Sequence, residues 1–124
     1  MNPIRVDRAG AKAPPNPEYF EGEVRMQRLV SEGDSRELEL IAVFFDAGAR
    51  TIPHVHETDQ VLLVVEGRCV VADGSGRREI GTGEWVLLPA HQWHWHGAVP
   101  GIRACHVSIR KPGPTDWSVP RRDW

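Results

Sequence analysis

The sequence has few cysteines, no surplus of basic residues and no long apolar run. Cys69 and Cys105 are its only cysteines and form no CxxC pair, so buried free thiols are expected rather than a disulfide, a metal clip or a redox pair. A net charge of -2 lacks the basic surplus that binding to nucleic-acid phosphates requires. No apolar run reaches membrane-spanning length, and the N-terminus carries charges and prolines instead of an apolar signal segment. We therefore expect a cytoplasmic protein with no membrane or nucleic-acid partner.

Helical periodicity is also missing, since no window of a dozen residues shows it. The chain is instead divided into short apolar or alternating runs separated by turns rich in Gly and Asp, at residues 24–30, 38–45, 60–65, 69–73, 84–90, 93–99 and 103–109. Such runs are typical of an all-β sandwich or barrel. A length of 124 residues allows one domain. Residues 1–17 hold four of the ten prolines, so we expect an extended N-terminal arm at 1–17 and a β-barrel domain at 18–124.

All six histidines lie between positions 54 and 106. Side chains alternate faces along a strand, so His54 and His56 point the same way, as do His94 and His96. If both segments line one barrel, four imidazoles meet in a small interior. Burying them without partners is costly, whereas neutral imidazole is a favoured ligand of divalent transition metals. One bound metal ion would explain the whole cluster.

Two plainer interpretations remain open at this point. A His-x-His pair on the surface of a strand is commonly solvated and has no function. The segment "HQWHWH" at 91–96 could form an aromatic surface patch in which the histidines only donate hydrogen bonds. Two clusters, each on an alternating strand after a glycine turn, favour the metal over both.

The spacing of these residues resembles the two motifs of the cupin superfamily. Gly48, His54-x-His56, Gln60 and Gly67 follow the first motif, with Gln60 where glutamate is usual. The second motif is matched by Gly83, Pro89 and His94, whereas His91 and Ala98 replace its usual glycine and asparagine. The resemblance implies a double-stranded β-helix, the jelly-roll barrel of cupins. Within that superfamily, "HWHGA" and the glutamine resemble a small single-domain subgroup that includes manganese-dependent cupin hydroxynitrile lyases and carboxymuconolactone decarboxylase-associated cupins.

The resemblance also implies a set of metal ligands. Carried over to this sequence, they are His54, His56, Gln60 and His94, holding one divalent ion per chain: manganese, iron or zinc, with nickel or copper also accommodated. An amide in place of a carboxylate removes a negative charge. The ion is then bound more weakly and is more electrophilic, which suits an anionic substrate or bound hydroxide.

Two further histidines are candidate catalytic residues. His96 shares a face with His94 and lies one strand step along, where it could act as a general acid or base, or only orient a ligand by hydrogen bonding. His106 begins the alternation His106, Ser108, Arg110, with Cys105 and its alternating neighbours on the opposite face.

Four residues are candidates for binding a substrate. If His106 faces the cavity, Ser108 and Arg110 share that orientation. An inward Arg110 could bind a carboxylate or phosphate, but we favour a solvated charge at the barrel rim. By resemblance to the subgroup, Ile41 and Val43 face the cavity. Trp93 and Trp95 alternate against the histidines and belong to the other face, and Trp117 and Trp124 are expected outside the barrel or against a partner subunit.

These observations predict a metal-dependent small cupin that acts on a small organic molecule, assembled as a homodimer or homotetramer. The favoured hypothesis is a lyase reaction, in which the metal acts as a Lewis acid and a histidine carries the proton. A metal-dependent dioxygenase is the alternative enzyme. A non-catalytic cupin that binds or senses a ligand is the alternative from another class.

Overall fold

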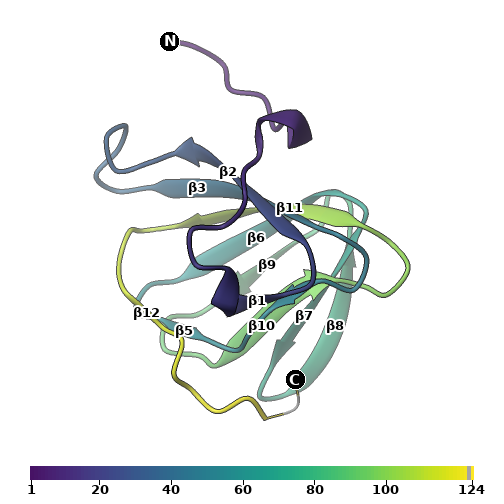
Figure 1. Ribbon diagram of the computed structural model, residues 1–124. Helices are drawn as coiled ribbons and strands as arrows, with labels where there is room; N and C mark the ends of the chain where they lie inside the picture. Colours follow the sequence, from purple (N-terminus) through teal and green to yellow (C-terminus); the bar gives the residue numbers. More distant parts are fainter. Residues whose placement is uncertain (123) are drawn as a thin grey trace.

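The protein is described by a computed structural model that covers residues 1–122 and 124 (Figure 1). Two five-stranded antiparallel sheets face each other across the core. One contains, in spatial order, β1 (Phe20–Glu21), β4 (Arg50–Thr51), β10 (His94–Ala98), β7 (Arg68–Asp73) and β8 (Gly76–Gly81). The other contains β2 (Val24–Val30), β3 (Glu39–Phe45), β11 (Ala104–Arg110), β6 (Gln60–Glu66) and β9 (Trp85–Leu88). A small ribbon pairs β12 (Thr115–Asp116) with β5 (Val55–His56). The predicted jelly-roll barrel is confirmed.

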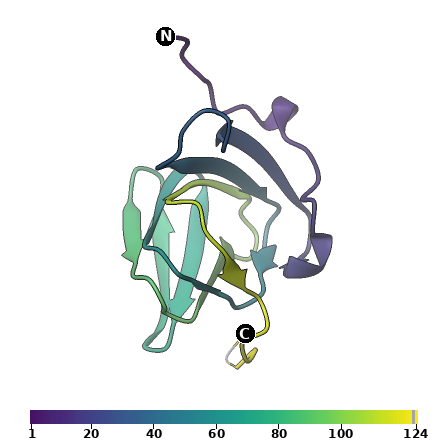
Figure 2. The same ribbon diagram turned by 90° about the vertical axis from the view of Figure 1, so that its left-hand side faces the viewer.

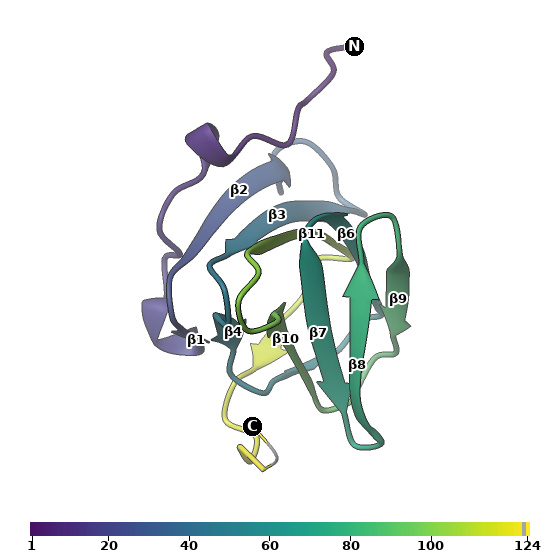
Figure 3. The same cartoon turned by 90° about the vertical axis from the view of Figure 1, so that its right-hand side faces the viewer.

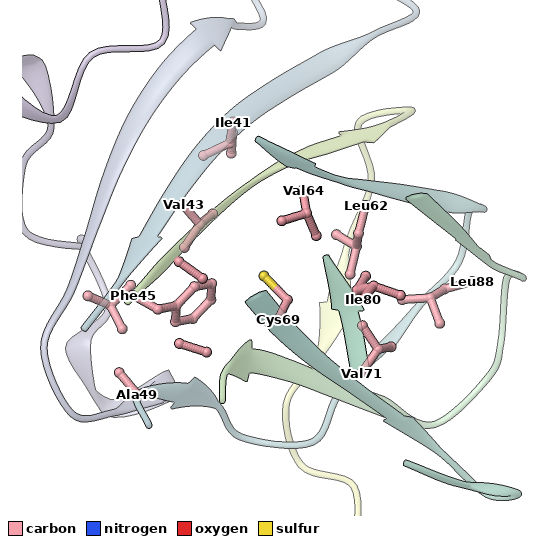
Figure 4. Packing of buried hydrophobic residues seen from close by; sticks show 13 residues of the cluster. Ile41, Val43, Phe45, Ala49, Leu62, Val64, Cys69, Val71, Ile80 and Leu88 are labelled. Atoms are coloured by element: carbon pink, nitrogen blue, oxygen red, sulfur yellow. The ribbon is translucent and has the colours of Figure 1, made fainter. Parts of the chain in front are cut away.

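Alternation along the strands separates two apolar layers. On β3, Ile41, Val43 and Phe45 point into the barrel (Figure 4). There they pack with Leu62 and Val64 of the same sheet and with residues of the opposite sheet, among them Val71 of β7. Ala42 and Phe44 face the other side of the same strand and pack with Cys105 and Val107 of β11. The predicted orientation of Ile41 and Val43 is therefore confirmed. Cys69 and Cys105 are buried and free, also as predicted.

The longer strands follow the predicted runs, but β8 was not predicted. Its residues Arg77, Arg78 and Glu79 are exposed, because β8 is the edge strand beyond β7 (Figure 3). Charged side chains protect an edge strand from pairing with other chains, and they also remove the apolar alternation by which a strand is predicted. β12 was missed because two residues are too short to show a pattern.

The N-terminal segment runs along the outside of β2 (Figures 1 and 2). It contains two 3₁₀ turns, η1 (Arg8–Gly10) and η2 (Pro17–Tyr19), and Lys12 exchanges backbone hydrogen bonds with Met26. Ala11 is buried in the outer apolar layer. The domain boundary after residue 17, the cytoplasmic location and the homodimer or homotetramer stay predictions. In the described part of the chain, no helix is both long and apolar enough to cross a membrane.

Gly97 of β10 provides a test of how closely β10 and β4 pack against each other. A Cβ atom there would lie 2.6 Å from Arg50 Cα and would also meet the Ala49 carbonyl oxygen. Both are backbone atoms, so Gly97→Ala should lower the free energy of unfolding by about 3 kcal/mol. Urea unfolding measures the change. Gly74→Ala is the control, because a Cβ at Gly74 meets nothing within 4 Å. Equal stability of the two variants would contradict the close approach.

Candidate metal centre

Three histidines meet at one end of the barrel. One ligand nitrogen from each of His54, His56 and His94 lies within 4.8 Å of the others. His54 and His94 form an isolated antiparallel bridge, in which each backbone N–H donates to the other residue's carbonyl, at 2.9 and 3.1 Å. Residues directly opposite each other in such a bridge project their side chains to the same face. His56 follows two residues after His54 and shares its orientation.

The Nδ1 atoms of the three rings all have partners that leave Nε2 available. His54 Nδ1 lies 2.8 Å from the Ile52 carbonyl oxygen, and His94 Nδ1 lies 2.9 Å from that of Gln92. His56 Nδ1 lies 2.9 Å from Thr115 Oγ1. A carbonyl can only accept, so Nδ1 of His54 and His94 carries the proton and Nε2 carries the lone pair. This is the arrangement of a metal-binding imidazole.

Gln60 adds an oxygen ligand to the three nitrogens. It begins β6 and lines the same cavity as His54 and His56. Its amide Nε2 donates to Ser108 Oγ at 2.7 Å, which orients the amide and directs Oε1 away from Ser108. Among the described residues, the buried Gln60 Oε1, His56 Nε2 and His94 Nε2 have no hydrogen-bond partner. Buried polar atoms are rarely left unpaired, and these are the atoms that would ligate a divalent ion. The residues therefore fit such an ion.

Burial keeps these imidazoles neutral. It lowers the pKa of His54 well below its ordinary value, and nearby His94 and His56 lower it further. Burial, followed by the charge of Arg110 and by His94, lowers the pKa of His56 to about 3. The pKa of His94 is lowered by burial as well. A histidine must be neutral to bind a metal, so all three are ready to do so at neutral pH.

His96 and His106 form a second pair beside the first group. His106 Nε2 lies 2.9 Å from His96 Nδ1, and both side chains are buried. Both line the cavity. The buried His96 Nε2 and His106 Nδ1 have no partner within the described chain. Burial lowers the pKa of His96 well below its ordinary value and that of His106 to about 4. One hydrogen bond thus joins two neutral imidazoles next to the candidate metal ligands.

The cavity above these histidines measures about 110 Å³. Its walls contain all four predicted substrate-binding residues, Ile41, Val43, Ser108 and Arg110, together with Phe20, Met26 and Trp117. A larger hollow of about 550 Å³ lies elsewhere and is lined by residues of β7, β8 and β10. No histidine is among its described lining residues. Because the unpaired ligand atoms belong to the smaller cavity, we place the candidate site there.

Arg110 faces this cavity, which corrects the expected solvated charge at the rim. Its side chain is only 12% exposed. Glu39, its register partner on β3, places Oε1 3.3 Å from Arg110 Nη2. Arg110 Nη1 donates to the carbonyl oxygens of Lys111 and Gly113. Since the carboxylate and the carbonyls already bind the guanidinium, Arg110 helps to build the cavity wall more than it offers a free fork to a substrate.

Trp117 was expected outside the barrel, but it lines the cavity. Its ring stacks on Tyr19 with the centroids 4.3 Å apart and also lies 4.3 Å from the His54 ring. The alternation of Thr115 and Trp117 in "TDW" could have indicated that both face inward, but β12 was not recognised as a strand. Trp95 faces the outer hollow, as predicted, between Arg50 and Arg77.

The metal-free protein should lose stability below pH 6.5. In the folded state the pKa values of His56 and His106 are about 3 and about 4, against an ordinary value of 6.5. The unfolded chain therefore binds more protons as the pH falls from 6.5 towards 4. The free energy of unfolding then decreases by about 1.4 kcal/mol per pH unit for each such histidine. Urea unfolding at pH 7.5, 6.5 and 5.5 measures this slope, and an unchanged stability would contradict it.

Comparison with known proteins agrees with this geometry. The cupin domain model matches residues 42–107, which contain all six histidines. An (R)-mandelonitrile lyase of Granulicella tundricola is 34% identical over 112 residues, covering 87% of this chain and 85% of that protein.

Two solved structures extend the comparison. A cupin-like protein of Thermotoga maritima is 32% identical, with a TM-score of 0.76 over 81% of this chain and 79% of its own. A polyketide cyclase of Streptomyces resistomycificus shares the fold at 22% identity, with a TM-score of 0.79 over 98% of this chain and 89% of its own. Since the matched domain covers more than half of the chain and the lyase is similar over most of its length, the chain belongs to the cupin family.

Proposed function

We propose that this cupin is a divalent-metal-dependent lyase that cleaves a small cyanohydrin into a carbonyl compound and hydrogen cyanide. The proposal rests on one observation: buried imidazoles meet beside an unpaired amide oxygen at the base of a small cavity. The similarity to an (R)-mandelonitrile lyase supports the choice of reaction.

His54, His56, His94 and Gln60 would hold the metal, which when bound supplies a Lewis acid for a substrate oxygen. Manganese, iron and zinc fit three imidazoles and an amide, and nickel and copper are also accommodated. None of these four side chains is a carboxylate, so the site keeps the full charge of the ion.

In this reaction His96 would transfer the proton, with His106 as its hydrogen-bond partner. With His96 Nδ1–H donating to His106 Nε2, the His96 Nε2 lone pair faces the cavity and can accept the proton of the cyanohydrin hydroxyl. The carbon–cyanide bond then breaks, its electron pair leaves with cyanide, and the carbonyl forms. His96 returns the proton to cyanide, so hydrogen cyanide leaves and the histidine is neutral again.

The remaining walls would hold the organic part of the substrate. The cavity also has an apolar lining, made by Ile41, Val43, Met26 and the rings of Phe20 and Trp117. A cavity of about 110 Å³ with an apolar lining and a few convergent polar groups suits a small organic molecule. Arg110 adds a cation that is already paired with Glu39.

A dioxygenase is the second candidate function, because neutral imidazole ligands also suit Fe(II) or Cu(II) with dioxygen. The lack of a carboxylate among the four candidate ligands favours both reactions equally, whereas the similar lyase favours only the first. A cupin that binds a ligand without catalysis is the third candidate. Metal content and turnover together distinguish the three.

Elemental analysis of protein purified without chelator or affinity metal should find about one manganese, iron or zinc per chain. His54→Ala should lose it, because one of three buried imidazoles is removed. Gln60→Glu should bind manganese more tightly than wild type, since the carboxylate adds a negative charge. His91→Asn is the control, because His91 is exposed and asparagine tolerates its φ of 66°. A metal-free wild type, even after incubation with these ions, would overturn the metal site.

Manganese-loaded protein should release benzaldehyde from mandelonitrile, followed by absorbance. His96→Gln should lower kcat by about 10²- to 10⁴-fold, the usual contribution of a general acid or base, without loss of manganese. Retained metal distinguishes the loss of a proton carrier from the loss of the site. Full activity in His96→Gln would exclude His96 as the base, and no turnover by loaded wild type would exclude this lyase reaction.

A further inference from the structure

The C-terminal segment supplies the hydrogen-bond partner of one candidate metal ligand. β12 pairs with β5 so that Thr115 lies opposite His56 and Asp116 opposite Val55. In Figure 1, β12 lies beside β5, and in Figure 2 the segment leading into it, in yellow, crosses that side of the barrel. This pairing places Thr115 Oγ1 2.9 Å from His56 Nδ1. We call residues 111–117 the strap.

The three candidate ligand histidines differ in how their tautomers are set. His54 and His94 face carbonyl oxygens, which only accept, so each ring must keep its proton on Nδ1. His56 faces a hydroxyl, which can accept from Nδ1–H or donate to a bare Nδ1. Only the first arrangement leaves the Nε2 lone pair for a metal. Among the three candidate ligand histidines, His56 is therefore the one whose metal-binding tautomer depends on the side chain of another residue, Thr115.

We propose that Thr115 is a positioning residue of the metal site: it holds His56 in the orientation and tautomer that bind the ion, so that docking of the strap and metal affinity are coupled. This inference rests on the proposed metal site. It assigns the strap, which lies beyond the matched cupin domain of residues 42–107, a part in metal binding.

Contacts on both sides of Thr115 hold the strap in place. Before it, the Lys111 carbonyl oxygen accepts from Thr58 Oγ1 at 3.2 Å and from Arg110 Nη1 at 3.3 Å. After it, the Trp117 ring stacks on Tyr19 with an interplanar angle of 3°. Pro112 and Pro114 restrict the backbone between these anchors. Thr115 therefore lies in a segment that is anchored on both sides. Such anchoring lets a hydrogen-bonding partner orient a metal ligand.

Coupling follows from the shared hydrogen bond. When Nε2 of His56 binds an ion, Nδ1 must carry the proton, and the bond to Thr115 Oγ1 has to run from the ring to the hydroxyl. Metal binding therefore favours the docked strap. By linkage, the docked strap favours metal binding by the same factor.

The test compares manganese affinity, measured by titration, in the full chain and three variants. Thr115→Val keeps the shape of the side chain and removes the acceptor, so it should weaken binding by about 10- to 100-fold. Thr115→Ser keeps a hydroxyl and should restore the wild-type affinity. Thr58→Val is the matched control, because it removes one strap hydrogen bond that touches no candidate ligand while the Arg110 and Trp117 anchors remain, so it should weaken binding far less than Thr115→Val. Thr115 is only partly buried, so valine fits there.

Hydrogen exchange adds a readout that does not depend on activity. Manganese should slow amide exchange at residues 115–117 in wild type but not in Thr115→Val.

The proposal is overturned if Thr115→Val binds manganese as tightly as wild type, or if Thr58→Val weakens binding equally, because strap packing alone would then be responsible. A wild type that binds no manganese overturns both this inference and the proposed function. If wild type binds and His54→Ala does not, an unchanged Thr115→Val overturns the role of Thr115 alone.

Discussion

The pair of backbone hydrogen bonds between His54 and His94 is the constraint on which the candidate site depends. It joins two segments that are far apart in the chain, and it places two imidazoles opposite each other on the inner face. His56 and His96 follow by strand alternation, one on each segment. Gln60 and Ser108 come from the opposite sheet, where β6 and β11 are neighbours. The two sheets therefore meet at the histidines, and neither could form the site alone.

Burial gives the site both its chemistry and its sensitivity to acid. Imidazoles in an apolar interior stay neutral, so their lone pairs are available to a metal or a proton. The same burial leaves His56 Nε2, His94 Nε2 and Gln60 Oε1 without partners in the described chain, although natural proteins seldom tolerate unpaired polar atoms. Fold stability alone would favour apolar side chains at these positions. The chain keeps polar ones where a ligand would satisfy them.

Prediction from sequence succeeded where strand alternation decided the outcome. Alternation placed His106, Ser108 and Arg110 on one face of β11, and all three line the cavity. Ile41 and Val43 line it as well, as the resemblance to the cupin subgroup implied. It failed where a contact between distant segments decided. Arg110 turns to the cavity because Glu39 is its neighbour on β3, and Trp117 reaches the cavity because a two-residue strand returns to β5. A strand so short has no periodicity to detect.

The sequence by itself determined the class of fold, which residues share a face of the longer strands, and the histidine and glutamine positions that resemble the cupin motifs. These properties follow from the spacing of residues along one strand or motif, and that spacing can be read directly from the sequence. Only the tertiary structure decided which atom partners each imidazole, that a C-terminal threonine lies within hydrogen-bond distance of His56, and that Trp117 lines the cavity. These depend on pairing between segments distant in the chain, and such pairing is set by the packing of the whole barrel.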